Sequence, residues 1–297
     1  MVTTGVRSDL RAILVKSTGG AGLGDSIRAL LAAIQYAHRA QRRIAVSWDD
    51  GLYGPRGENI FPSLFQLVDL PLTPVADLDP ISVHPAVWRE RLELPFGDLY
   101  AALRGDGWDR TWALRHLSAD QRRLDYPEAT VVVWDFERFA SVWRLTPLSD
   151  RLGTSPDEAM GVLARRHLRL TPAVQGAVDA FRRARFLPRM IGVHIRKTAE
   201  ATQGGKQVDE AAVIRAIDAR RRRHPEAGLL LATDNQAVVE RMQRRYPDLT
   251  LRDKWFPAPG EPIHFTDGGP DCLVRTRDAL TEIGLLAACD TLIYPAE

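Results

Sequence analysis

Cysteine is scarce in this sequence of 297 residues and occurs only as Cys272 and Cys289. The two cysteines form no metal-binding spacing, and so few thiols exclude a disulfide-stapled fold and favour a reduced, intracellular protein. No apolar run approaches the roughly 18 residues that a membrane-spanning helix needs. Residues 1–17 contain no hydrophobic signal core. We therefore expect a soluble, cytoplasmic protein without a membrane span.

An excess of one charge is also absent, because 40 basic and 38 acidic side chains leave a formal net charge of +2. This balance gives no reason to expect a polyanionic partner, so nucleic acid binding is not predicted. Lysine is rare, and almost every basic residue is arginine. Arginine binds phosphate and carboxylate through a planar fork, although a GC-rich genome also produces an arginine-rich composition. Nothing in the composition indicates an oligomeric state.

The N-terminal part of the sequence has the pattern strand, helix, strand. A short apolar run at 12–17 is followed by a glycine turn, a helix-like stretch at 26–41 and an apolar run at 43–48. Two strands joined by a crossover helix predict a parallel sheet. The pattern breaks up over 49–130, where Gly and Pro punctuate loops. The elements expected next are a buried strand and two helices that begin at proline: 129–134, 155–170 and 171–186.

Strands and helices alternate again from residue 189 onward, which predicts a second parallel sheet. The predicted strands are 189–196, 228–235, 250–255 and 291–295, and the predicted helices are 208–227, 236–249 and 275–290. We expect an α/β fold with two Rossmann-like domains, residues 1–185 and 186–297. A ligand is expected in the cleft between them, near the carboxyl ends of the strands.

The first candidate site is the glycine turn "GGAGLGD" at 19–25. Glycines allow a ligand to approach the backbone, and the helix that follows offers free N–H groups and a positive dipole end. The strict dinucleotide pattern GxGxxG fails because its last position is Asp25, and no Lys–Ser or Lys–Thr follows as in a Walker loop. Two readings stay open: a ligand-binding turn, or a structural turn with Asp25 or Ser26 as the helix N-cap.

The second candidate is the strand end "IGVHIRKT" at 191–198. His194 and Arg196 are two residues apart and therefore project from the same face of a strand. Because a charge at the end of a buried strand is costly without a partner, an anionic ligand such as a diphosphate is a plausible partner for Arg196. The alternative is a structural salt bridge for Arg196 and a satisfied core histidine at His194.

Two acidic residues are further candidates. Asp234 stands at the end of the strand 228–235, where it either contacts a ligand or caps the next helix. Glu282 lies in the helix 275–290. It either faces inward, where it could accept hydrogen bonds from the N1 and N2 donors of guanine, or belongs to a solvated helix surface.

The order of these motifs resembles the NodZ-like and α-1,6-fucosyltransferase group, which is related to the protein O-fucosyltransferases. Six segments occur in this chain in the same order as in the family: "GLGD", "RRIAVSW", "NIFPSLFQLVD", "IGVHIRKT", "LLLATDN" and "EIGLLAACDTLIYP". The resemblance runs from about residue 12 to the end, and 70–185 matches poorly. It implies a GT-B fold and an inverting glycosyltransferase that uses GDP-fucose without a bound metal. The sequence does not identify the acceptor, which is a glycan or a small molecule.

The resemblance also implies roles for particular residues. Arg196 would bind the β-phosphate of GDP and help the diphosphate depart, and His194 would lie beside the nucleotide. Gly22 and Gly24 would bring the first-domain turn close to the donor. Glu282 falls where the family commonly has an aspartate that holds guanine. Asp234, in the "ATD" segment, completes this set of donor-site candidates.

The sequence departs from the family after Thr198. Ala199 and Glu200 replace an Asp–Lys pair, and a glutamate suspected as catalytic base in related enzymes is replaced near Gly204. We expect Glu200 to be the base that takes the acceptor proton, with Asp209 and Glu210 as alternatives.

The segment around Lys206 is either a solvated loop or a mobile loop that closes over the donor and brings Lys206 to a phosphate. The chain ends at "LIYPAE", where the family usually continues with a Ser-containing loop and a helix, so either this copy is truncated or its end is not represented in the sequence. Two other readings stay open: a different nucleotide sugar as donor, and a degenerate, non-catalytic nucleotide-binding protein.

Overall fold

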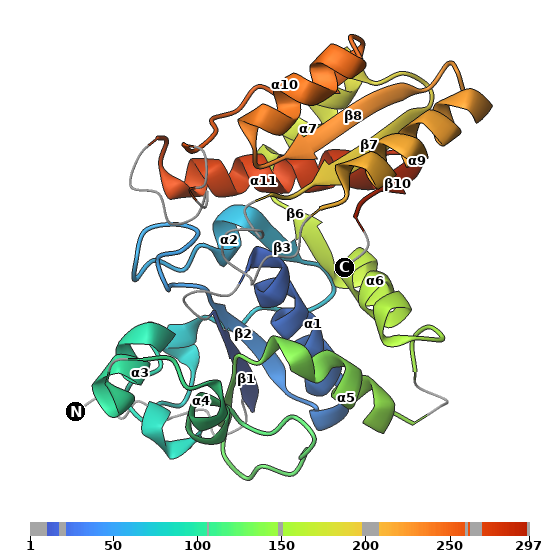
Figure 1. Ribbon diagram of the computed structural model, residues 1–297. Helices are drawn as coiled ribbons and strands as arrows, with labels where there is room; N and C mark the ends of the chain where they lie inside the picture. Colours follow the sequence, from blue (N-terminus) through green and yellow to red (C-terminus); the bar gives the residue numbers. More distant parts are fainter. Residues whose placement is uncertain are drawn as a thin grey trace. The chain divides into compact units, whose positions relative to one another are not determined.

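The computed structural model describes residues 11–17, 22–105, 107–147, 151–197, 208–258, 261 and 269–295. The chain forms two compact units, Met1–Thr171 and Pro172–Glu297, and each contains a four-stranded parallel sheet (Figure 1). The helix α7 (Pro172–Arg185) falls in the second unit, where it packs along α11 (Cys272–Ala287). The division expected from the sequence lies after this helix, at residue 185.

The sheet of the first unit has the strand order β2-β1-β5-β4, and all its pairs are parallel. Its strands are β1 (Ala12–Lys16), β2 (Arg43–Ser47), β4 (Val83–His84) and β5 (Thr130–Val133). The three longer strands confirm the predictions made from apolar runs. Such runs are apolar at consecutive positions because helices and loops cover both faces of a parallel sheet.

The two faces of this sheet are covered by different segments. The helix α1 (Leu23–Ala40) is the crossover between β1 and β2 and packs against both strands, with α5 (Phe139–Leu145) beside it (Figure 1). The opposite face, which includes Leu14 and Val132, packs on an aromatic-rich core from the segment between β2 and β5. That core includes Trp88, Phe96, Leu99, Tyr100 and Trp134.

The start of α1 differs from the prediction. Gly22 is the N-cap, and Asp25 occupies the third helical position, where its Oδ2 accepts a hydrogen bond from the Gly22 backbone N–H at 3.1 Å. The expectation that Asp25 or Ser26 is the N-cap is therefore wrong. The helix begins earlier because Leu23 is buried and anchors the first turn in the core.

The segment 49–130 contains short elements between loops, in agreement with its broken sequence pattern. They are α2 (Phe61–Leu64), β3 (Phe65–Leu67), two 3₁₀ turns (Val75–Asp77 and Ala86–Trp88), β4, α3 (Phe96–Arg104) and α4 (Arg110–His116). A third 3₁₀ turn, Phe136–Arg138, follows β5.

The helix predicted at 155–170 is shorter than expected. Ser155 caps α6 (Pro156–His167) by accepting from the Glu158 backbone N–H, as the Ser-Pro start predicted. The remaining residues form β6 (Leu168–Leu170), which pairs antiparallel with β3. The prediction of a helix through residue 170 is wrong because β3, about a hundred residues earlier in the chain, offers a strand edge that local periodicity does not reveal.

The second unit has the strand order β10-β7-β8-β9, again entirely parallel. Its strands are β7 (Met190–Ile195), β8 (Gly228–Thr233), β9 (Leu249–Leu251) and β10 (Thr291–Ile293). The helices α9 (Glu210–Arg223) and α10 (Gln236–Arg245) connect β7, β8 and β9, and α11 leads to β10. From β7, the chain adds β8 and β9 on one side of that strand and then adds β10 on the other side.

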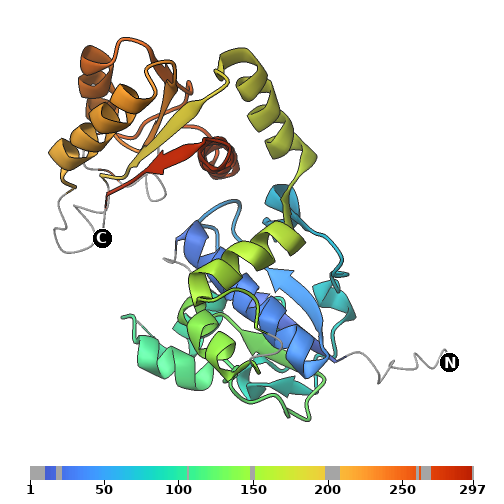
Figure 2. The same cartoon turned by 90° about the vertical axis from the view of Figure 1, so that its right-hand side faces the viewer.

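The close packing of α11 on this sheet depends on a glycine. A Cβ atom on Gly192 in β7 would lie 3.0 Å from the Cys289 sulfur and 3.1 Å from Cδ2 of Leu286. Figure 2 shows α11 end-on beside β10 within this unit. Within the described residues, no helix has the length and apolar character that a membrane crossing requires.

Candidate functional site

The carboxyl ends of β7 and β8 carry most of the candidate residues of the second unit. Ile191, Val193 and Ile195 are buried, whereas His194 and Arg196 are exposed, so the predicted alternation along β7 is confirmed. The strand order changes direction at β7, between its neighbours β10 and β8. Open α/β sheets bind ligands outside the carboxyl ends of strands at such a switch point.

Asp234 connects the ends of these two strands. Its Oδ1 accepts a hydrogen bond from the Lys197 backbone N–H at 2.8 Å, and its Oδ2 lies 4.0 Å from Nε of Arg196. The Asp234 side chain is only 14% exposed, whereas that of Arg196 is 52% exposed. Asp234 therefore orients the strand end while much of the guanidinium remains accessible.

The alternative role for Asp234, a helix cap, is taken by its neighbour. Asn235 is the N-cap of α10, and its Oδ1 accepts from the Val238 backbone N–H at 3.2 Å. The salt-bridge alternative for Arg196 is present in part, because the contact with Asp234 lies at the outer limit of an ion pair. A pair at this distance contributes little to stability on an exposed edge.

The electrostatics at this edge favour a neutral His194. Partial burial among the strand ends lowers the pKa of His194, and the positive charges of Arg196 and Lys254 lower it further, against the opposing effect of Asp234. His194 is solvent-exposed all the same, so the interpretation of a satisfied core histidine is wrong. A neutral imidazole can both donate and accept a hydrogen bond.

Glu282 faces inward and is paired with a lysine. Lys254 Nζ lies 2.6 Å from Glu282 Oε2, and the two side chains are 7% and 12% exposed. Burial raises the pKa of Glu282, although the charges of Lys254 and Arg252 act against it. The alternative of a solvated helix surface for Glu282 is therefore wrong.

The Lys254–Glu282 pair lies at the same edge of the sheet. Both residues, with Thr233 at the end of β8, line a small cavity of about 30 Å³. The sequence analysis assigned no role to Lys254. The available signal was the charged run "RDK" directly after the short strand β9, at the edge where β7 and β8 also end.

Two of the three candidates for the catalytic base have structural partners. Asp209 caps α9 by accepting from the Ala212 backbone N–H at 2.8 Å. Glu210 lies 3.0 Å from Lys197 Nζ and 2.8 Å from Arg241 Nη2. Burial opposes the ionisation of Glu210, but the hydrogen bonds from Arg241 and Lys197 outweigh it and hold the pKa below its usual value.

The third candidate for the base, Glu200, lies outside the described residues, as does Lys206. Within the ranges that the structure describes, no cluster of three His, Cys, Asp or Glu side chains is arranged to hold a metal ion.

In the first unit, Gly22 and Gly24 stand at the start of α1. A Cβ on Gly22 would lie 3.4 Å from Asp25 Oδ2, an ordinary contact, and a Cβ on Gly24 would meet no atom within 4 Å. Gly22 has a φ of −64°, which any residue can adopt. The described part of the unit therefore does not itself require glycine at either position.

A buried polar cluster, which the sequence analysis missed, lies at the carboxyl ends of β1 and β2. Lys16 Nζ donates to Ser47 Oγ and to Asp49 Oδ2, both at 2.9 Å. Burial lowers the pKa of Lys16 despite the opposing charge of Asp49, and burial raises the pKa of Asp50. The available signal was a lysine at the end of an apolar strand, directly before the glycine turn.

Comparison with known proteins relates the chain to one family. The family model for Nodulation protein Z (NodZ) matches residues 155–297. The Nodulation protein Z of Azorhizobium caulinodans is 28% identical, with 92% of this chain and 83% of the relative covered. That of Bradyrhizobium diazoefficiens is also 28% identical, with 92% and 72% covered. This chain is similar to NodZ over most of its length.

Solved structures extend this relationship to the fold. A NodZ α-1,6-fucosyltransferase soaked with GDP-fucose superposes with a TM-score of 0.61 at 20% identity, covering 96% of this chain and 88% of that chain. POFUT1 in complex with GDP gives a TM-score of 0.50 at 10% identity, covering 96% and 92%. The predicted α/β, GT-B-like architecture and the resemblance to NodZ are confirmed, and the similarity includes 70–185, which matched poorly in sequence.

Proposed function

We propose that this protein is an inverting fucosyltransferase that transfers fucose from GDP-fucose to a glycan or a small molecule. The relationship to NodZ over 92% of the chain supports this proposal, as does a fold shared with an α-1,6-fucosyltransferase soaked with GDP-fucose. The observation that carries it is the accessible guanidinium of Arg196 at the switch point of the second sheet, beside His194 and Asp234.

In the proposed reaction, Arg196 binds the β-phosphate of the donor. An acceptor hydroxyl attacks C1 of fucose from the face opposite GDP, a new C1–O bond forms, and the bond from C1 to the β-phosphate oxygen breaks. The electron pair of that bond passes to the phosphate, whose new charge the guanidinium stabilises. Asp234 orients Arg196, and His194 hydrogen-bonds the nucleotide.

The remaining roles complete this proposal. Glu200 accepts the proton of the acceptor hydroxyl, because Asp209 and Glu210 are already engaged in a helix cap and in ion pairs. Lys206 reaches a donor phosphate, and the backbone at Gly22 and Gly24 approaches the donor. Glu282 accepts hydrogen bonds from guanine N1 and N2 after the Lys254 ammonium releases one of the carboxylate oxygens.

Arginine and lysine supply the positive charge in this scheme, so transfer requires no added metal, and EDTA is expected to leave turnover unchanged. We also propose a cytoplasmic location, since neither Cys272 nor Cys289 forms a disulfide.

Replacement of Arg196 tests the proposal. Arg196→Ala is expected to abolish release of GDP from GDP-fucose in the presence of an oligosaccharide panel and to weaken GDP binding by about 10- to 100-fold. Arg244→Ala, an exposed arginine on α10 of the same unit, is the matched control and should change neither. Full turnover in Arg196→Ala would refute the assignment.

The Lys254–Glu282 pair favours a second candidate, the same reaction with another nucleotide sugar. A carboxylate already bound to a buried ammonium is a poorer acceptor for guanine than a free one. Thermal stabilisation by GDP, UDP and dTDP sugars separates the candidates, since a ligand at 100 times its Kd stabilises by about 2.7 kcal/mol. Stronger stabilisation by UDP or dTDP sugars would reject GDP-fucose. Nucleotide binding without any turnover would indicate a degenerate, non-catalytic protein.

A further inference from the structure

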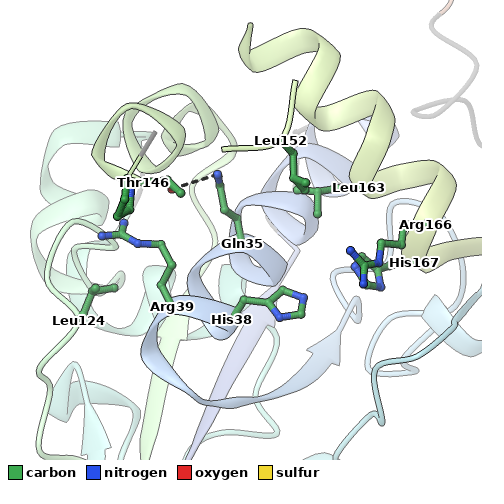
Figure 3. Close-up of a pocket in the computed structure, with 10 residues that line it drawn as sticks. Gln35, His38, Arg39, Leu124, Thr146, Leu152, Leu163, Arg166 and His167 are labelled. Atoms are coloured by element: carbon green, nitrogen blue, oxygen red, sulfur yellow. Dashed lines mark hydrogen bonds between the residues drawn. The ribbon is translucent and has the colours of Figure 1, made fainter. Parts of the chain in front are cut away.

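The first unit contains a cavity of about 610 Å³ that the proposed reaction does not use. Its walls come from the last turns of α1, the loop before β5 that carries Leu124, the segment that follows α5, and α6 (Figure 3). Every lining residue belongs to the first unit, so the cavity is complete within that unit. The volume is within the range of small-molecule sites, roughly 300–1,000 Å³.

The cavity is remote from the glycine turn, although both lie on α1. Its lining residues on this helix are Gln35, His38 and Arg39, whereas Gly22 caps the opposite end. At 1.5 Å per residue, the separation along the helix axis from Gly22 to Arg39 is about 25 Å. A ligand in this cavity would therefore not contact the residues at Gly22 and Gly24.

The polar lining of the cavity is basic. Arg39 and Arg166 lie on different helices and on different sides of the cavity, with His38 and His167 between them and Arg166 beside His167 (Figure 3). None of the described lining residues is acidic, and the other walls include Leu124 and Leu163. The lining therefore suits a negatively charged group attached to an apolar body.

Two polar atoms of the lining are buried without a partner among the described residues. Gln35 is 7% exposed, and its Nε2 lies 3.3 Å from Thr146 Oγ1, but its Oε1 has no hydrogen-bond partner. The guanidinium nitrogen Nη1 of Arg39, on the next turn of the helix, is buried and equally without a partner. A polar group or a water molecule beside them would satisfy both atoms.

The two histidines add hydrogen-bonding groups at the other side. Their ring centroids are 5.5 Å apart. His167 Nδ1 lies 3.2 Å from the Val68 carbonyl oxygen and donates to it, because a carbonyl oxygen can only accept. Burial, together with His167 and Arg166, lowers the pKa of His38. The fixed positive charge of the cavity thus comes from the two arginines.

We propose that this cavity binds a small organic oxyanion, a phosphate ester or a carboxylate carried on an apolar body, at a site separate from the sheet edges. The oxyanion accepts from the Arg39 guanidinium, and the apolar body contacts Leu124 and Leu163. Arg166 attracts the anion from the opposite wall.

Calorimetric titration of the intact protein tests this site, and the cavity variants separate it from any phosphate site at Arg196. The probes are phenyl phosphate and benzoate, with inorganic phosphate and phenol as the isolated halves. We expect saturable one-to-one binding of phenyl phosphate or benzoate, and at least about 10-fold weaker binding of phosphate and phenol. The better of the two bound probes identifies the oxyanion class.

Arg39→Gln and Arg166→Gln are each expected to weaken the probe by about 10-fold. Arg165→Gln, an exposed position on α6 outside the lining, is the matched control and should have no effect. If either variant fails to fold, the wild-type His38 and His167 ring proton resonances provide the readout and should shift on titration. No saturable binding, or binding that neither arginine affects, would overturn the proposal, and neither result bears on transfer at Arg196.

Discussion

Lys254 and Glu282 form an ion pair of 2.6 Å at the carboxyl edge of the second sheet, and both side chains are nearly buried. The two residues lie on different elements, the segment after β9 and α11. A buried pair is costly to break from one side, because the remaining charge loses its partner but not its burial. This pair therefore provides a test of both stability and nucleotide recognition.

Lys254→Met is expected to lower the free energy of unfolding by about 3 kcal/mol, since it leaves the Glu282 carboxylate buried and unpaired. The double variant Lys254→Met/Glu282→Leu should recover most of this loss. Urea denaturation measures both. A double variant less stable than Lys254→Met would contradict the argument.

Glu282→Gln is expected to weaken GDP by about 10-fold and to leave the weaker binding of UDP unchanged, because the amide can no longer accept from both guanine donors. Calorimetric titration with GDP and with UDP measures the ratio of the two affinities in the wild type and in Glu282→Gln. An equal loss for both would mean that Glu282 acts through the fold and not through the base.

Asp234 and Asn235 are neighbours with separable roles. Asp234→Ala removes the acceptor for the Lys197 N–H and the group beside Arg196, so GDP affinity should fall by about 5- to 10-fold, with about 1–2 kcal/mol of stability lost. Asn235→Ala removes only the cap of α10 and should cost about 1 kcal/mol of stability without a change in GDP affinity. Equal losses of GDP affinity in Asp234→Ala and Asn235→Ala would contradict these separate roles.

GDP affinity should depend on the protonation of His194. Its pKa is lowered in the free protein by burial and by nearby cations, and a bound diphosphate raises it. Proton uptake therefore accompanies binding, and affinity should increase as the pH falls through about 6.5. The phosphate of GDP also titrates near pH 6, so His194→Gln supplies the baseline. If GDP affinity changes with pH equally in the wild type and in His194→Gln, proton uptake by His194 is excluded.

The same shift predicts the stability profile of the free protein. Because folding lowers the pKa of His194, the unfolded chain binds more protons just below pH 6.5, and stability should fall as the pH decreases through that value. The fall should be smaller in His194→Gln, as measured by urea denaturation at several pH values.

Gly24 tests whether the glycine turn serves a ligand. Alanine meets no atom within 4 Å there, and it favours the helix by up to about 1 kcal/mol. Gly24→Ala should therefore be as stable as the wild type or more stable, yet turn over GDP-fucose more slowly if the backbone approaches the donor. Gly176→Ala in α7, also without a neighbour within 4 Å, is the matched control. Unchanged turnover in Gly24→Ala would leave the turn with a structural role.

Much of the fold was predictable because its signals are local. Consecutive apolar residues revealed β1, β2, β5, β7 and β8, and Ser155 before proline revealed the start of α6. Several boundaries were mispredicted. The strand expected at 250–255 is the shorter β9, and α11 begins at Cys272, before the expected residue 275. At the start of α1 and the end of α6 a tertiary contact decided the outcome, the burial of Leu23 and the pairing of β6 with β3.

The candidate site was predictable in part. The alternation of His194 and Arg196 follows from strand geometry alone. The roles of Lys254 and Lys16 did not follow, because each depends on a partner supplied by another element, Glu282 in one case and Asp49 in the other. The cavity beside Arg39 could not be predicted either, since its lining comes from four separate segments.

By itself, the sequence determined where the longer strands of the two sheets form, that both sheets are parallel, and which side chains stand at the ends of those strands. Periodicity and chain connectivity impose these features over a few residues to a few tens of residues. Only the tertiary structure decided the state of those side chains: that Asp234 orients a strand end while Asn235 caps the helix, and that Glu282 is buried against Lys254. Burial and pairing depend on packing between distant elements, and they set the charge and accessibility on which chemistry at the site depends.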